Sequence, residues 1–234
     1  MTNKIIIAFT AVLVSLSSFS QTATQIVAKH IEAIGGKENW SKVKSLRLES
    51  SMKMQGTEIK IITTQIDKKA LRLDISVMGM NGYQVVTTTE GWSFMPFQGQ
   101  TKPEPMTVDD VKMSQDQLEI QSDFITYIEK EKKLEDLGTE EVDGVECFKL
   151  KLTDKDGIET SYFIDQSNYF LIKETSKIKA NGQEMENVVT YNNYELTNEG
   201  ILLPKNIVSL QGAMEITKTE VNPVIDEAIF IVKK

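Results

Sequence analysis

The sequence predicts a mainly β protein of the α+β class. We expect a single curved antiparallel sheet of about eleven strands, forming an incomplete β-barrel lidded by an N-terminal helix and one or two central helices. Three observations support this: apolar and polar residues alternate over most of the chain, glycine turns recur between the alternating segments, and helical spacing is confined to two regions. Each strand has one apolar face, so the sheet must cover that face.

Residues 1–20 have the pattern of a secretory signal peptide. Lys4 supplies a basic start, Ile5 to Leu16 form an apolar run, and Ser18 and Ser20 suit a cleavage site. The run is shorter than the ~20 residues of a membrane span. No cysteine directly follows it to carry a lipid anchor. We therefore expect export without lipidation, with residues 21–234 forming one domain.

Two regions have helical character. Thr24 to Ile34 places its apolar residues on one face and ends before Gly35, and Glu38 to Lys44 adds one more turn. Thr107 to about Lys130 begins with a capping residue and predicts one or two further helices. These central helices separate two stretches of alternating sequence.

The alternating stretches predict an antiparallel meander in each half. The first half has strands from Leu46, over Thr57–Ile66, Leu71–Met80 and Tyr83–Thr89. The second half predicts strands over Leu134–Glu141, Val145–Thr153, Glu159–Asp165, Tyr169–Lys179, Glu184–Leu196, Leu202–Leu210, Ala213–Val221 and Ala228–Val232.

The residue types exclude most catalytic designs. The chain has one histidine, His30, and one cysteine, Cys147, so a zinc site lacks the ligands it needs. A catalytic triad would have to be built around His30, which lies among apolar helical positions, and no G-x-S-x-G nucleophile elbow occurs. No phosphate-binding glycine loop occurs. The net charge of −8 argues against nucleic acid as a partner. We expect a binding protein with no enzymatic activity, no cofactor and no metal.

Large apolar residues suggest a lining for a concave surface. Met52 with Met54, and Met78 with Met80, are pairs two residues apart that either fill a core or form a flexible ligand wall. The stretch from Gly91 to Gly99 gathers further apolar side chains around Pro96. The predicted ligand-binding residues of the hydrophobic cavity are Met52, Met54, Leu73, Ile75, Trp92, Phe94 and Phe97.

Alternation gives the Gly91–Gly99 stretch two apolar faces. It separates Trp92 and Phe94 from Met95 and Phe97. Pro96 has no N–H to donate, so it ends the strand. We expect this stretch to form the boundary between the first half of the sheet and the lid helices.

Three local patterns resemble the LolA/LolB-like superfamily of lipoprotein carriers, and more narrowly the outer-membrane lipoprotein-sorting type. They are Gly91-Trp92 followed by Pro96-Phe97; Tyr162-Phe163-Ile164-Asp165, Tyr169, Leu171-Ile172-Lys173 and Gly182; and Tyr191 to Tyr194, Gly200, Pro204, Asn222, Ile225-Asp226 and Phe230. The resemblance covers nearly all of residues 21–234. It implies a half-barrel in the periplasm whose apolar concave face receives acyl chains.

The resemblance also implies a basic residue that holds the lid closed. The nearest candidates are Lys69 and Arg72, but alternation with Leu71 and Leu73 predicts that Arg72 points outward. Two non-enzymatic functions remain open: a periplasmic binder or carrier of lipid or lipoprotein acyl chains, and an envelope interaction domain with a filled core that docks to a protein partner. The third and least favoured alternative is an enzyme that works through carboxylates.

Overall fold

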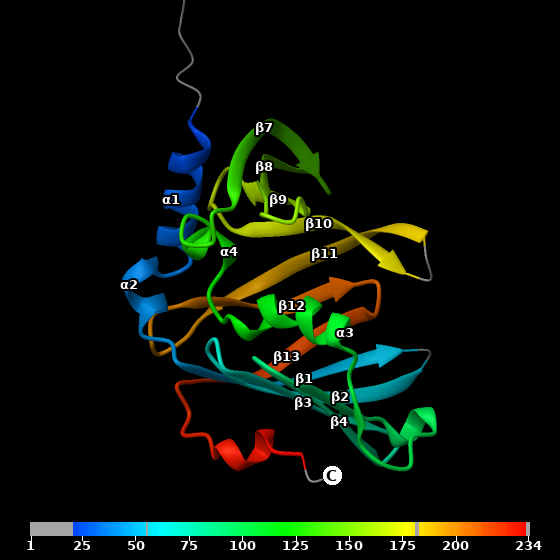
Figure 1. The fold of residues 1–234 in the computed structure, drawn as a ribbon. Coiled ribbons are helices and arrows are strands. Elements are labelled where there is room, and N and C mark those ends of the chain that lie inside the picture. The colour runs from blue at the N-terminus through cyan, green and yellow to red at the C-terminus, as the bar shows by residue number, and fades with distance from the viewer. Residues whose placement is uncertain (1–20, 55, 181–182, 233–234) are drawn as a thin grey trace, which may run out of the picture.

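The computed structural model describes residues 21–54, 56–180 and 183–232, and within them the chain forms one open, 13-stranded antiparallel sheet (Figure 1). The sheet order is β6-β5-β4-β3-β2-β1-β13-β12-β11-β10-β9-β8-β7. The strands are β1 (Ser45–Met54), β2 (Thr57–Ile66), β3 (Ala70–Val77), β4 (Met80–Thr87), β5 (Gly91–Phe94), β6 (Glu104–Pro105), β7 (Lys133–Val142), β8 (Val145–Thr153), β9 (Glu159–Asp165), β10 (Leu171–Ala180), β11 (Gln183–Leu196), β12 (Leu202–Ser209) and β13 (Gly212–Val221).

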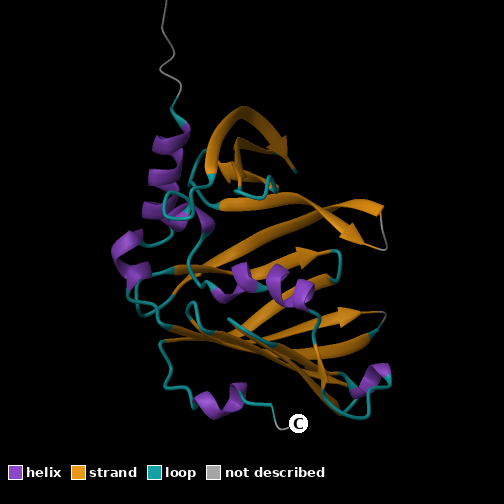
Figure 2. Cartoon of the chain, viewed as in Figure 1, coloured by secondary structure: helices purple, strands orange, loops and turns teal. Residues whose placement is uncertain are grey.

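Short helices lie against the curved sheet, as the sequence predicted (Figure 2). A capping box between Thr22 and Gln25 begins the first of them. The helices are α1 (Ala23–Ala33), α2 (Gly36–Ser41), α3 (Val108–Met113) and α4 (Asp123–Thr126), and the 3-10 helices are η1 (Pro96–Gln98), η2 (Gln115–Leu118) and η3 (Glu227–Phe230).

Gly35 fixes the position of α1 and α2 on the sheet. Its φ of +112° lies in the left-handed region, and a Cβ atom built on it would lie 2.2 Å from the carbonyl oxygen of Gly200. Only glycine fits there, because a side chain would clash with the backbone of the β11–β12 turn. The neighbouring amide of Leu202 donates a hydrogen bond of 2.9 Å to the carbonyl of Ile34.

The prediction of a last strand over Ala228–Val232 is wrong. Residues Glu227–Phe230 form η3, which begins where the Asp226 side chain accepts a hydrogen bond from the amide of Ala228. Phe230 packs against Ala70 and Val85 of β3 and β4. The apolar residues of this segment contact the sheet through one helical turn rather than through a strand ladder.

The two faces of the sheet are distinguished by what covers them. On the face that we call concave, Leu71 and Val86 pack against Leu118 of η2. On the opposite, convex face, Ala70 and Val85 pack against Phe230. The strict alternation of side chains then assigns each residue of β3 and β4 to one of these faces.

The concave face is filled over strands β8 and β9. Ile26 and Val27 of α1 and Phe124 of α4 pack there on Leu150 and Ile164, and all five side chains are buried. Phe124 also contacts the rings of Tyr162 and His30, at centroid distances of 4.6 and 5.4 Å. This half of the molecule is therefore a packed core.

The described residues contain no helix that is long and apolar enough to cross a membrane. The predicted signal peptide, residues 1–20, lies outside the described residues.

We predict that the filled half tolerates cavity formation poorly. Leu150 is fully buried, so Leu150→Ala should lower the free energy of unfolding by roughly 2–5 kcal/mol. Ile75, on the same face but half-buried, should cost only about 1 kcal/mol when replaced by Ala. Urea denaturation of both variants measures the two values, and equal losses would contradict the distinction.

Candidate functional site

The concave face is open over β1 to β3, β12 and β13. Cross-strand pairing places its residues in rows: one runs Val77, Ile59, Met52, Met214 and Ile207. Ile59 is buried, and the other four are half-buried. They are apolar and lack the helical cover found over β8 and β9, so this surface is the candidate site.

Burial changes along the strands of this site. At one end, Leu46, Gln65 and Leu71 lie in a row and are buried beneath the segment that contains η2. Further along β3, Leu73 and Ile75 are only half-buried. The concave face therefore opens progressively away from η2.

Four of the seven predicted lining residues lie on or over this face. Met52, Leu73 and Ile75 belong to it by register. Phe97 joins them because its ring lies over Gly82, the partner of Ile75: a Cβ on Gly82 would come within 2.9 Å of Phe97 Cε1. The glycine thus makes room for the aromatic ring of η1.

Trp92 and Phe94 lie on the other face. Trp92 pairs with Val85, and Phe94 pairs with Tyr83, whose ring lies 5.8 Å away. Val85 and Tyr83 belong to the convex cluster around Phe230. Trp92 and Phe94 therefore do not line the same surface as Leu73 and Ile75. They lie on the opposite face of the sheet from Phe97.

Neither of the two methionine pairs lines the concave face as a whole. Met54 is half exposed at the end of β1, and Met78 is 80% exposed in the β3–β4 turn with a φ of +51°. Met52 alone of these three lies within the concave row. Met54 and Met78 therefore lie at hairpin tips instead of within the lining.

Polar side chains lie where the open part of the concave face adjoins its filled part. Tyr162 donates a 2.7 Å hydrogen bond to Asp123, which also pairs with Lys132 at 2.8 Å. Burial raises the pKa of Asp123, but the hydrogen bonds from Lys132 and Tyr162 outweigh it and the net shift is downward. Asp123 is therefore held as a carboxylate.

Glu174 lies on the same face, opposite Tyr162 and Val189 in the neighbouring strands. Burial raises the pKa of Glu174 above its ordinary value of 4.5, although a hydrogen bond from Tyr191 opposes this and the charge of Asp123 adds to it. Glu174 thus binds a proton more tightly in the folded protein than in the unfolded chain.

We predict a pH-dependent gain in stability from Glu174→Gln. The native protein loses stability as pH rises from the unfolded pKa of 4.5 towards the raised folded pKa, whereas a neutral Gln does not ionise. The variant should melt at a higher temperature than the parent at pH 7 and at nearly the same temperature near pH ~4. Thermal unfolding at both pH values measures this. The exposed Glu186→Gln is the control, and a lower melting temperature for Glu174→Gln at pH 7 would contradict the prediction.

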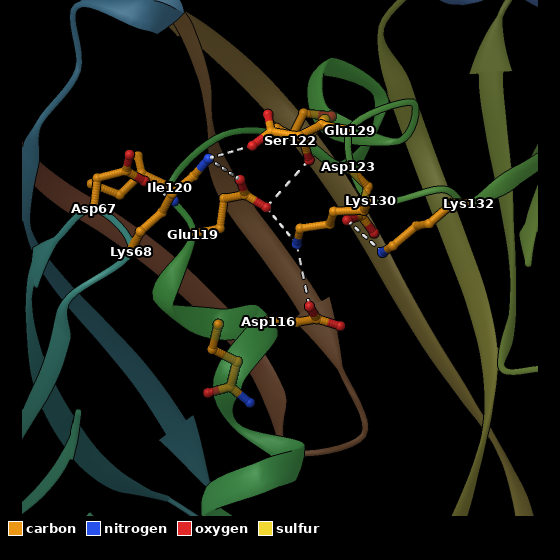
Figure 3. A network of polar contacts seen from close by, with 12 residues as sticks. Asp67, Lys68, Asp116, Glu119, Ile120, Ser122, Asp123, Glu129, Lys130 and Lys132 are labelled. Carbon is orange, nitrogen blue, oxygen red and sulfur yellow. Dashed lines mark hydrogen bonds and ion pairs between the residues drawn. The ribbon is translucent and has the colours of Figure 1, made fainter. Parts of the chain in front are cut away.

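A cluster of contacts fastens the central segment to the β2–β3 turn, and we call it the latch: Asp67, Lys68, Asp116, Glu119 and Lys130 (Figure 3). The Lys68 amide donates a 2.7 Å hydrogen bond to the carbonyl of Leu118, and the Ile120 amide donates to Asp67 Oδ1 at 3.0 Å. These two hydrogen bonds hold the backbone on either side of Glu119.

The buried carboxylate of Glu119 is the centre of the latch. Its side chain is 6% exposed; Oε1 lies 3.2 Å from Lys68 Nζ, and Oε2 pairs with Lys130. Contact with Glu119 raises the pKa of Lys68. Burial lowers the pKa of Lys130, but Glu119 and Asp116 more than compensate and the pKa is raised. Both lysines therefore remain charged, as the buried carboxylate requires.

The two basic residues expected from the sequence lie elsewhere. Lys69 pairs with Glu227 of η3 at 2.6 Å. Arg72 points outward, as alternation predicted: it donates to the carbonyl of Ile229 and lies over the ring of Tyr83. Lys68 was missed because its partner Glu119 is distant in sequence, although the Asp67-Lys68-Lys69 turn is a visible charge cluster.

We predict that Lys68, not Lys69, stabilises the central segment. Lys68→Met removes one of the two cations around Glu119. It should reduce the free energy of local opening by about 1 kcal/mol, or roughly fivefold in hydrogen exchange over residues 115–127. Lys69→Met is the matched control, because its partner Glu227 belongs to η3. Equal exchange in the two variants would refute the assignment.

A cleft of about 590 Å³ lies where β12 and β13 separate. These strands pair only from Asn206 with Glu215 to Ser209 with Gly212. Beyond that point Leu203 and Lys205 face Ile216 and the following residues of β13 across the cleft. The gap interrupts the sheet beside the candidate site.

His30 and Cys147 are structural. His30 is buried, its Nδ1 lies 2.8 Å from the Tyr169 carbonyl, and burial lowers its pKa. Cys147 is fully buried, and burial raises the pKa of its thiol to about 11. Among the described residues, no three His, Cys, Asp or Glu side chains are grouped to hold a metal ion.

Comparisons with known proteins identify the fold. No protein-family model matches this chain, and no curated protein is found to match it. Among solved structures, the chain is similar to a DUF1329 family protein from Desulfovibrio piger, with a TM-score of 0.56 and 12% identity over 91% of this chain and 98% of that one.

Two further structures agree. A LolA superfamily protein from Nitrosomonas europaea has a TM-score of 0.54 and 13% identity, over 89% of this chain and 97% of that one. A putative outer membrane lipoprotein-sorting protein domain from Vibrio parahaemolyticus has a TM-score of 0.52 and 13% identity, over 88% and 95%. The chain has a LolA/LolB-like fold, as the sequence patterns predicted.

Proposed function

We propose that this protein binds acyl chains of lipids or lipoproteins on its open concave face and carries them in the periplasm. The observation that carries the proposal is the contrast within one sheet. Helices α1 and α4 fill the concave face over β8 and β9, whereas four of the five residues in the apolar row over β1 to β3, β12 and β13 are only half-buried. A filled core explains the first region but not the second.

The chemistry of the open face suits a flexible hydrocarbon chain. Met52 and Met214 face each other across β1 and β13, and thioether side chains adapt to irregular apolar shapes. By register, β1 to β3 place no charged residue on this face, and Ser50, Thr63 and Gln65 are polar but uncharged, so binding would depend on apolar area more than on ion pairs. No catalytic step forms part of the proposal.

The segment containing α3 offers a cover for such a ligand. The latch and Leu118 fasten its C-terminal side to the sheet, whereas α3 itself has no buried residue and Met113 is 72% exposed. The N-terminal side is also tied to the sheet, because the Met106 amide donates a 2.8 Å hydrogen bond to the Gly91 carbonyl. Between these two attachments, the exposed apolar residues of α3 can pack onto a bound chain. Such packing would supply part of the binding free energy by removing Met113 from water.

Two residues adjacent in β3 provide the test. Ile75→Glu places a charge on the concave face and should weaken binding of a fluorescent fatty acid about tenfold or more, because burying a carboxylate against a hydrocarbon chain is unfavourable. Ser76→Glu places the same charge on the opposite face and should leave binding unchanged. Fluorescence titration of both variants, with circular dichroism as a check of folding, measures the difference.

The outcome separates this proposal from its alternative. Lipid found by mass spectrometry in the protein purified from the periplasm, and lost from Ile75→Glu alone, would support carriage of acyl chains. Absence of bound lipid together with no response to the fatty acid in the parent protein would reject it. A stable protein partner retained by Ile75→Glu would then favour the interaction domain with a filled core.

A further inference from the structure

Large apolar side chains are exposed at the tips of three hairpins, and we call this set the rim: Met54, Met78, Met80, Val208 and Leu210. Their exposed fractions are 49, 80, 43, 41 and 56%. Hairpin turns ordinarily carry polar residues, because their side chains face water. Five exposed apolar residues at three turns therefore require an explanation.

The three hairpins are neighbours at one end of the sheet. In the order β4-β3-β2-β1-β13-β12, they are the β3–β4, β1–β2 and β12–β13 hairpins. The row of partners Val77, Ile59, Met52 and Met214 crosses all three just before their tips. Figure 1 shows these turns on the side of the molecule away from α1 and α2.

Charge is absent from the rim. Residues 54–57, 75–89 and 206–214 contain no Asp, Glu, Lys or Arg, in a chain of which 26% is charged. The turns at the opposite end of the same strands contain Asp67, Lys68, Lys69 and Glu199. The two ends of one sheet thus differ in polarity, so the rim's composition is not a general property of this chain.

We propose that the rim docks on a phospholipid bilayer by inserting these side chains into the interface. A bilayer suits separate projecting side chains, because each one inserted contributes its own transfer free energy. A protein partner or second copy suits them less: five side chains offer a few hundred Å², below the roughly 800 Å² that each partner gives to a stable interface. The absence of Lys and Arg from the tips fits zwitterionic rather than anionic headgroups.

The rim is continuous with the concave face. Met52, Val77 and Met214 lie directly behind the tips and belong to the half-buried apolar row. A hydrocarbon chain at the bilayer surface would meet an apolar path into the site without crossing a charged turn. Docking itself does not depend on acyl-chain binding, so the two proposals can fail independently.

Vesicle flotation tests the docking. The triple variant Met54→Gln, Met78→Gln, Leu210→Gln should lose roughly tenfold or more of its partitioning onto vesicles of phosphatidylcholine and phosphatidylethanolamine. The matched control is Ile128→Gln, Ile158→Gln, Val224→Gln, whose parent residues are 74, 57 and 104% exposed but lie outside the rim. The control should partition like the parent.

Insertion can be located with a fluorophore. Cys147 is fully buried, so a cysteine introduced by Met78→Cys can be labelled selectively with an environment-sensitive dye. Emission should shift to the blue on adding vesicles, and the same dye at Ile158→Cys should not shift. This readout distinguishes insertion from contact of another surface with the bilayer.

Three results would overturn the proposal: no partitioning of the parent protein, equal partitioning of the rim and control variants, or a concentration-dependent dimer in ultracentrifugation that the rim variant abolishes. The last would assign the rim to a second copy. Fatty-acid titration of the rim variant without vesicles separates the two functions, because retained binding with lost flotation shows that docking alone was removed.

Discussion

The pairing of β1 with β13 is the constraint on which the rest of the structure depends. Hairpins and short connections build β1 to β6 on one side and β7 to β13 on the other, so each half-sheet needs mainly local contacts. Within the described sheet, the two half-sheets are joined by the ladder from Leu46 with Val221 to Met52 with Met214, across more than 160 residues. Ordering this long loop costs entropy. The single sheet, its curvature and the rim all require that ladder.

Most of the fold could be predicted because its signals are local. Alternation fixes strands and faces within a few residues, and it correctly placed Arg72 outward. The last segment failed because Ile229 and Phe230 are apolar but adjacent, which suits a helical turn on a sheet as well as a strand. Its sequence alone does not show whether a partner strand is available.

The site was less predictable because it depends on distant partners. Phe97 follows Pro96, where the strand ends, so alternation no longer determines its side, and only the missing side chain of Gly82 places it on the concave face. Lys68 and Glu119 meet only after the central segment crosses the sheet. Neither contact follows from periodicity, since both join elements whose relative position is set by the folded sheet.

The two ends of the concave face differ in charge. At one end, charged turns bind the central segment through Glu119, a buried carboxylate that would be costly to leave without Lys68 and Lys130. At the other end, uncharged tips lead into Met52 and its neighbours. In the proposed function, a hydrocarbon chain would enter from the apolar end, because the charged latch holds the central segment at the opposite end. The same sheet therefore supplies both the anchor of the cover and the approach to the surface beneath it.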